Sequence, residues 1–290
     1  FNTVLVKPHS PTSEPEIFLE DSPLPSVSSF TSLGLEWRVG KRYPDIDQCI
    51  SLARRSSYSI FNRSTYGKDG LDPSGSFKIF TAYIVPRLLH GLNATVLPGH
   101  EIDKIERFYR KQLRLIQGIP ESTANEAVYA MLGALPAEAL LQMRRFSLLG
   151  QVCRLQADHP LKLLALRQLA IYGNSSGSWF CQMRALCNQY SIDIYHALIF
   201  PWKKTSWKNY YKRTIKQHFK QQITQGLHSK SSLKWTLWDP AYEPHGMWTS
   251  CTGRCHLVKS ATTRARMLLG RYTCGESAWR RETEPDCPLC

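Results

Sequence analysis

Residues 100–120 read HEIDKIERFYRKQLRLIQGIP, and this stretch decides the fold class. Its apolar residues recur with the period of an α-helix and its cations occupy the opposite face, so the helix can pack on a core and still meet solvent. Gly118 and Pro120 end it, because glycine adopts the left-handed C-cap conformation and proline cannot continue a helix. The expected core residues are Ile102, Ile105, Tyr109, Leu113 and Ile116. The cations on the outer face are Lys104, Arg107, Arg110, Lys111 and Arg114.

Helical periodicity continues on both sides of this segment, which predicts a mainly α fold. Prolines and glycines set the limits of the helices, and Pro86 is expected to kink the second of them because it lacks a backbone N–H. The predicted helices cover about residues 44–62, 75–97, 122–132, 136–156, 160–171, 178–190, 203–225 and 255–270.

Residues 1–40 differ from the rest because they carry short extended runs separated by prolines, which exclude helix. The runs are NTVLV at 2–6, EIFLE at 16–20 and SSFTSLGLEWRV at 28–39. We therefore expect a small β-hairpin element first, then a helical bundle over 41–172, and then a basic helical connector over 173–286. The linker-like GNSSGS at 173–178 places the boundary between the last two domains.

The positive charge is concentrated near one end of the chain. The net charge is +14 and the pI is near 9.4, and residues 201–290 hold 16 basic against 6 acidic residues. Such a region usually meets a polyanion, most often nucleic acid, although acidic lipid headgroups or plain solvent are alternatives. No apolar run approaches the ~18 residues of a membrane span. The cysteines number nine, which favours reduced thiols over disulfides, so we expect an intracellular protein of the nucleus or cytoplasm with no membrane partner.

Residues 201–238 form a second basic element, with nine lysines and arginines and no acidic residue. Lysines recur at every fourth position, so like charges adjoin along the predicted helix, at a cost of about 0.2–0.5 kcal/mol each unless a polyanion compensates. Aromatic residues are interleaved with them, which is typical of single-stranded nucleic-acid binding by stacking, although some of the rings must be core. The lysines are Lys204, Lys208, Lys212, Lys216 and Lys220. The rings expected to stack on bases are Trp207 and Tyr211.

The sequence ends with Cys287 and Cys290, whose Cys-x-x-Cys spacing is that of half a zinc site. Either the other half lies beyond residue 290, or Cys251 and Cys255 supply it across a 31-residue spacer. An apolar helix stripe starts at Cys255, which favours capping or packing roles for that earlier pair. We therefore expect a truncated zinc knuckle at 287–290, zinc binding only if the knuckle is completed, and a chain that is an interior piece of a larger protein.

The order of these pieces resembles one family. A strand pair ending in TSLGLEW (31–37) is followed by a helix, by TAYIVPRLLHGLNATVLPGHEIDKIERFYRKQLRLIQGIP (81–120), and by NEAVYAMLGALPAEALLQMRRFSLLGQV (125–152). ARMLLGRY and CPLC follow near the end. Together these segments resemble the region after the catalytic palm of non-long-terminal-repeat (LINE-type) retrotransposon reverse transcriptases, and the resemblance spans most of the chain.

The resemblance implies a role for each part. Residues 24–35 would end the palm in a turn that grips the primer strand, with Leu33 and Gly34 closing it. The helices to about residue 155 would be a thumb that lies along the template–primer duplex, so the implied partners are RNA and an RNA–DNA duplex. The magnesium site would belong to the parent polymerase and not to this chain, which has no Asp-Asp pair and only Glu20 and Asp21 as adjacent acids. This fragment alone is not expected to polymerise.

Two alternatives stay open. One is a stand-alone nucleic-acid-binding protein derived from such an element, without enzyme activity. The other is a non-enzymatic helical protein-interaction scaffold whose charge is incidental. Salt-dependent RNA binding would separate the nucleic-acid hypotheses from the scaffold, and the oligomeric state is not determined by the sequence.

Overall fold

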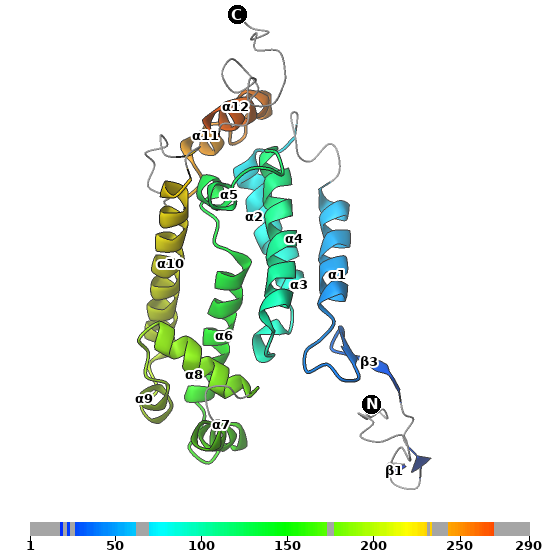
Figure 1. The fold of residues 1–290 in the computed structure, drawn as a ribbon, viewed down its shortest axis with the longest axis vertical. Helices are drawn as coiled ribbons and strands as arrows, with labels where there is room; N and C mark the ends of the chain where they lie inside the picture. The colour runs from blue at the N-terminus through cyan, green and yellow to red at the C-terminus, as the bar shows by residue number, and fades with distance from the viewer. Residues whose placement is uncertain are drawn as a thin grey trace, which may run out of the picture.

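The computed structural model describes residues 18–19, 22–23, 27–61, 70–172, 177–230, 233 and 243–269. These residues form a mainly helical fold that follows two short pairs of antiparallel strands (Figure 1), as the sequence predicts. The longer helices are α1 (Ile46–Ile60), α4 (Gly99–Gln117), α6 (Ala137–Cys153), α7 (Pro160–Ile171), α8 (Trp179–Gln189), α10 (Lys204–His228) and α12 (Cys255–Leu268). The shorter ones are α2 (Pro73–Ile79), α3 (Val85–Leu88), α5 (Asn125–Leu132), α9 (Ile194–Ile199) and α11 (Gly246–Thr249). The sequence did not predict α9 and α11.

The expected hairpin is present. β3 (Ser29–Ser32) pairs with β4 (Leu35–Arg38), with Ser32 opposite Leu35. Leu33 and Gly34 join them with φ angles of 51° and 78°, the pair of positive values that a two-residue type I′ turn requires. A smaller pair, β1 (Phe18–Leu19) with β2 (Ser22–Pro23), precedes it, and the strand expected at 2–6 lies outside the described residues.

The hairpin is fixed to the helical body. The backbone N–H of Asp45 donates to the carbonyl oxygen of Glu36 at 2.8 Å, and the N–H of Glu36 donates to Gln48 Oε1 at 3.0 Å. Leu35 is buried against Gly91, where an added Cβ would overlap its side chain. Contacts to α1 and to the loop after α3 therefore hold the hairpin in place.

The helix expected at 75–97 is interrupted and shorter than predicted. α2 passes into a π-helical turn, η1 (Phe80–Ile84), in which the N–H of Val85 donates to the carbonyl oxygen of Phe80, five residues back. This wider turn lies directly before Pro86, whose ring crowds the preceding turn and which has no N–H to donate. α3 then ends, and Gly91 takes a left-handed conformation (φ 69°) before the 3-10 turn η2 (Leu92–Ala94). Glycine stops the helix where periodicity alone would continue it.

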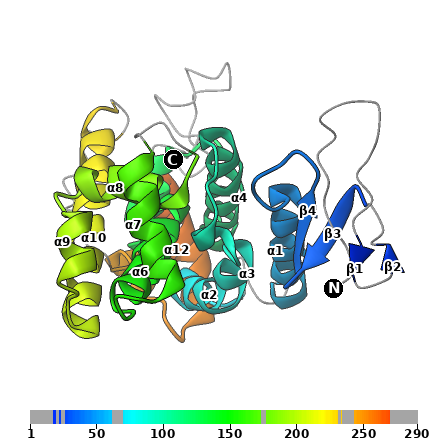
Figure 2. The same cartoon turned by 90° about the horizontal axis from the view of Figure 1, so that it is seen from below.

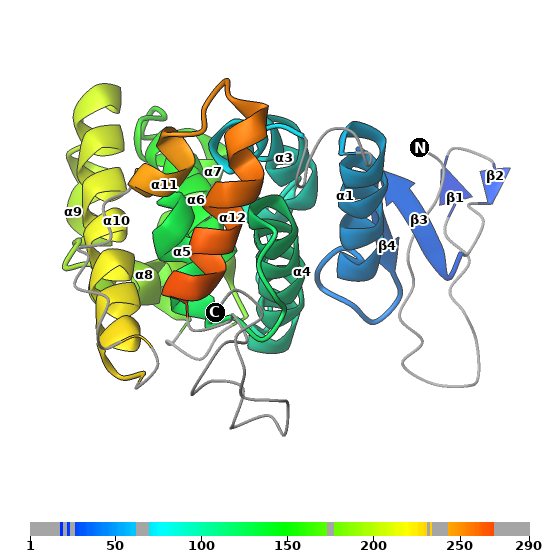
Figure 3. The ribbon, with the colours of Figure 1, turned by 90° about the horizontal axis from the view of Figure 1, so that it is seen from above.

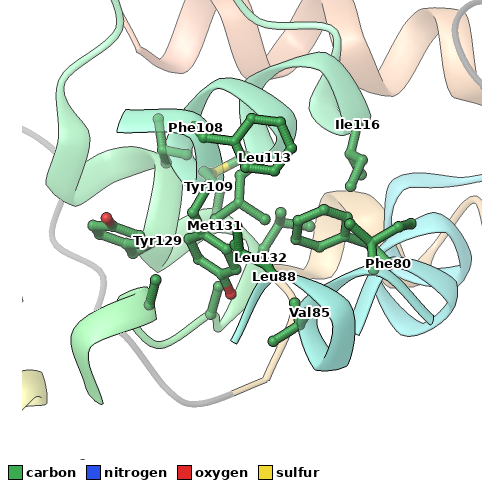
Figure 4. Packing of buried hydrophobic residues seen from close by; sticks show 14 of the residues in the cluster. Phe80, Val85, Leu88, Phe108, Tyr109, Leu113, Ile116, Tyr129, Met131 and Leu132 are labelled. Atoms are coloured by element: carbon green, nitrogen blue, oxygen red, sulfur yellow. The ribbon is translucent and has the colours of Figure 1, made fainter. Parts of the chain in front are cut away.

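Two hydrophobic cores hold the helices together. The first lies among α1 to α5, the start of α6, the C-terminal half of α10, and α11 with α12. Figure 4 shows its centre, where Phe80 from η1 faces Tyr109 and Leu113 from α4, and the Phe80 and Tyr109 ring centroids are 5.5 Å apart. In Figure 3, α11 and α12 cross over the ends of α4 and α5, and Arg266 of α12 donates to the Gly118 carbonyl oxygen at 2.6 Å.

The second core lies among α6 to α9 and the N-terminal half of α10. Figure 2 shows α9 and α10 on one side of the bundle, with α1 and the hairpin on the other. Both cores contain residues from before and after the boundary expected at 172–173, and α10 contributes residues to both of them. The expected division into a thumb-like domain and a connector stays a prediction.

The sequence of α10 explains this bridging. Its buried residues fall at every fourth position, and each four-residue step advances about 40° beyond a full turn. The buried row therefore winds around the helix and meets α6 first and α5 later. The residues of this row are Trp207, Tyr211, Ile215, Phe219, Ile223 and Leu227.

Candidate nucleic-acid interface

The core face of α4 is the predicted one, but it is wider. Ile105, Tyr109, Leu113 and Ile116 are buried, while Ile102 is partly buried. Glu101, Glu106, Gln112 and Gln117 are buried as well, because α4 contacts four other helices, α1, α2, α5 and α6. Little of the α4 surface is left for a partner.

Several α4 cations are used inside the protein. Lys104 Nζ lies 3.1 Å from Glu101 Oε2 and 3.2 Å from Asp47 Oδ2 on α1. Arg114 donates to the Thr123 carbonyl oxygen at 2.8 Å and to Asn125 Oδ1 at 2.7 Å, which holds the loop before α5. Burial lowers the pKa of Arg114, and the nearby guanidinium of Arg110 lowers it further. Lys104 and Arg114 are therefore half-buried and paired within the protein, which reduces the open basic face expected on α4.

The other three α4 cations are less constrained. Arg110 lies 4.0 Å from Glu106 Oε1, and burial raises the pKa of that carboxyl. Lys111 and Glu121 form an exposed pair at 3.3 Å, which contributes little stability. Arg107 is exposed, with its Nε 3.4 Å from the carbonyl oxygen of Asp103. Arg107 and Lys111 are the α4 cations that a phosphate could reach most easily.

The rings predicted to stack on bases lie in the second core. Trp207 and Tyr211 are each 4% exposed. Trp207 donates its indole N–H to the Phe146 carbonyl oxygen at 2.8 Å, and Tyr211 stacks on the Phe146 ring with a 16° interplanar angle. Base stacking on these two rings is therefore excluded in this conformation, because their faces are covered by α6.

The lysines beside those rings line a groove. Lys204, Lys208 and Lys212 are exposed on α10 and face α6 across a hollow of about 420 Å³. Arg144 of α6 and Arg154, the C-cap residue of α6, line the same hollow. Five cations and no carboxylate thus line it among the described residues, and we call this hollow the basic groove. Lys216, exposed, and Lys220, half-buried, extend the row along α10 beyond the groove.

The cations that line the basic groove repel one another. Burial lowers the pKa of Lys212, and the neighbouring Lys208 and Lys216 lower it further. Burial also lowers the pKa of Arg144, which donates to the Leu89 carbonyl oxygen at 3.2 Å. Bound phosphate would relieve this repulsion, because a negative charge stabilises the protonated forms of all these groups.

The sequence pointed to the α10 lysines but not to their partners on α6. Arg144 lies 60 positions before Lys204, and its neighbour Arg145 has a different role, donating to the Thr95 carbonyl oxygen at 3.0 Å. The only signal was the unusual pair of adjacent arginines within an apolar helix. Helical periodicity alone could not show which of the two arginines, Arg144 or Arg145, faces α10.

The turn of the hairpin presents an exposed leucine. Leu33 is 85% exposed and adopts a left-handed conformation that costs an ordinary residue about 1–2 kcal/mol. Its carbonyl oxygen lies 3.0 Å from His90 Nε2, and Gly34 completes the turn. Neither packing nor backbone preference accounts for leucine at this position.

The described residues include no group of three or more histidine, cysteine, aspartate or glutamate side chains placed to bind a metal ion. Cys251 is buried and its thiol donates to the Trp248 carbonyl oxygen at 3.2 Å, whereas Cys255 is exposed at the start of α12. Cys251 therefore packs as expected, and Cys287 and Cys290 lie outside the described residues.

Among the described helices, none combines the length and apolar character needed to cross a membrane.

Comparisons with protein-family models, with curated proteins and with solved structures give no match to this chain. The resemblance to LINE-type reverse transcriptases consequently rests on the sequence motifs alone. The basic groove and the exposed hairpin turn are independent observations on which a function can be argued.

Proposed function

We propose that this chain is the thumb and connector region of a non-long-terminal-repeat retrotransposon reverse transcriptase, and that its basic groove holds the phosphate backbone of a template–primer duplex. The observation that carries the proposal is the set of five cations from α10, α6 and the C-cap of α6 that line the groove. Lysine and arginine contacts to phosphates position a duplex without reading its sequence.

A duplex suits the groove better than a single strand. The two large rings beside its lysines, Trp207 and Tyr211, are buried and offer no free face to a base. Binding there would depend on charge and helix shape, as is usual for A-form duplexes. The exposed cations Arg107 and Lys111 on α4 could contribute further phosphate contacts.

The turn at Leu33 and Gly34 takes the primer-contacting role in this proposal. Its support is the exposure of Leu33 in a backbone conformation that leucine disfavours, since strain of this kind is often retained at functional sites. The described residues hold no cluster of carboxylates suited to magnesium, so no polymerisation step is assigned to them. Zinc binding is likewise assigned only to a completed knuckle.

The test measures binding of a fluorescein-labelled blunt RNA–DNA hybrid by anisotropy between about 50 and 200 mM salt. The variant Lys208→Gln/Lys212→Gln removes two groove cations, and Arg167→Gln/Arg213→Gln removes two exposed cations that do not line the groove. We expect the groove variant to weaken binding and to flatten the slope of log K against log salt by about two units, at ~0.9 per phosphate contact. The control variant should change the slope by less.

Equal effects of the two variants would show that the charge acts as a diffuse field, and the groove assignment would then be wrong. Absence of salt-dependent binding by the unmodified chain would favour the scaffold alternative. That alternative has one observation of its own, a set of exposed apolar side chains on α7 and at the end of α9. These residues are Leu163, Leu164, Ile171, Ile199 and Phe200.

A further inference from the structure

A second hollow lies between the end of the hairpin, the loop around η2 and the start of α8. Its volume is about 620 Å³, within the ~300–1,000 Å³ typical of small-ligand sites. Residues far apart in the sequence line it, since it is bounded by 37–43, 94–98 and 177–182. We call it the aromatic pocket, because three rings line it.

The three rings are held in place by the surrounding fold. Trp37 and Tyr43 are partly buried against the first core, and Trp179 is partly buried against the second. Trp179 also donates its indole N–H to the Asn93 carbonyl oxygen at 2.9 Å, which fixes the orientation of its ring. Trp37 lies opposite Phe30 in the hairpin ladder. Rings that keep part of their surface exposed in fixed positions offer preformed stacking surfaces.

Cations accompany these rings. Lys41 and Arg42 line the aromatic pocket, and Lys41 Nζ lies 5.8 Å from the centroid of the Tyr43 ring. The described residues of the lining include no acid. The carboxylates of Glu36 in β4 and of Asp45 at the start of α1 are paired with Arg38 at 3.0 and 2.7 Å. The net charge of the lining is therefore positive.

We infer that the aromatic pocket binds an unpaired nucleotide of single-stranded nucleic acid. The base would stack on the rings, the flanking phosphate would lie on Lys41 and Arg42, and the Gln182 amide could donate to and accept from the edge of the base. A base within a duplex does not expose its face, so this site selects single strands. The chemistry expected on α10 from the sequence, rings among cations, is present here instead.

This inference goes beyond the proposed duplex groove and depends on different residues. An acidic peptide is the other polyanion that the two cations could hold. It would use the charge but not the three flat surfaces, which is why a nucleotide fits the lining better.

The test measures binding of a short fluorescein-labelled oligouridylate and of the blunt RNA–DNA hybrid to the same variants. Tyr43→Leu removes one stacking surface, and the control Tyr58→Leu removes an exposed ring on α1 that does not line the pocket. We expect Tyr43→Leu to weaken oligouridylate binding by about 5- to 150-fold and to leave hybrid binding nearly unchanged. Tyr58→Leu should change neither.

Two further measurements keep the test decisive if Tyr43→Leu unfolds the chain. Arg42→Gln alters an exposed side chain and should weaken oligouridylate binding more than the control Arg55→Gln on α1. A thiouridine oligonucleotide, cross-linked by light to the unmodified chain, should attach within 37–43, 94–98 or 177–182.

Cross-links confined to other segments would overturn the inference, as would equal loss of strand and hybrid binding in Tyr43→Leu. Displacement of the oligouridylate by an acidic peptide at lower concentration than by unlabelled oligouridylate would assign the pocket to peptides instead. The outcome is separable from that of the duplex proposal. Lys208→Gln/Lys212→Gln should weaken hybrid binding without moving the cross-links.

Discussion

Gly150 of α6 allows α10 to pack closely, and its replacement tests how the basic groove is built. An added Cβ at Gly150 would overlap Trp207 Nε1 and Cδ1 and lie 3.1 Å from Cε2. The indole cannot move freely, because its N–H donates to the Phe146 carbonyl oxygen at 2.8 Å and its ring is 4% exposed. Gly150→Ala must therefore displace α10 or break this hydrogen bond.

The magnitude follows from three contributions to the free energy of unfolding. Overpacking costs about 1–3 kcal/mol, loss of the indole hydrogen bond costs about 0.5–1.5 kcal/mol, and alanine gains about 1 kcal/mol in helix propensity over glycine. The sum is a destabilisation of about 0.5–3.5 kcal/mol. Because α10 carries Lys204, Lys208 and Lys212, the displacement should also weaken binding of the RNA–DNA hybrid.

Urea denaturation followed by circular dichroism measures the change. Gly99→Ala is the matched control, since Gly99 opens α4 with nothing within 4 Å of the added Cβ, and it should be neutral or stabilise by up to about 1 kcal/mol. In a Trp207→Phe background the smaller ring should reduce the cost of Gly150→Ala, with a coupling of about 0.5–3 kcal/mol. If Gly150→Ala instead behaves like Gly99→Ala in the unmodified background, the close approach of α6 and α10 is refuted.

Three further predictions concern the groove, the cysteines and the hairpin. Burial lowers the pKa of Lys212, so as pH rises this lysine loses its charge before an ordinary lysine does. The affinity for the RNA–DNA hybrid should fall over the same pH range. Lys212→Arg should retain that affinity to higher pH, as measured by anisotropy titrations at constant ionic strength. If the affinities of the variant and the unmodified chain fall in parallel, Lys212 does not contact phosphate. Burial raises the pKa of Cys49 and of Cys153 to about 11, whereas Cys255 is exposed, so N-ethylmaleimide at neutral pH should modify Cys255 and spare the other two in peptide maps. Equal modification of Cys153 would contradict its burial. Leu33→Asn should stabilise the fold by about 1 kcal/mol in urea denaturation, because asparagine tolerates the left-handed conformation better than leucine, and should weaken hybrid binding if this turn contacts the primer. Unchanged hybrid binding would remove that role.

Local chemistry was enough to place most elements. The helix at 100–117 was predicted to within one residue of Gly99–Gln117, because an apolar stripe and a left-handed Gly118 define it within its own length. The hairpin at 28–39 was predicted for the same reason, because extended runs and a turn glycine can be recognised within a few positions of sequence. The 75–97 helix was wrong at its end, because Gly91 could not be recognised as a stop without its contact to Leu35.

The sites required the tertiary structure. Along α10, the buried row that starts at Trp207 and the lysine row that starts at Lys204 both repeat every four residues. The sequence therefore shows two adjacent rows, but not how far the neighbouring helices cover each of them. The aromatic pocket brings Trp37 and Trp179 to one hollow from 142 positions apart. Sequence periodicity fixes a residue's direction relative to its own helix axis, so it determined the elements of this protein. What each face meets depends on contacts between distant segments, and only the packed chain decided those.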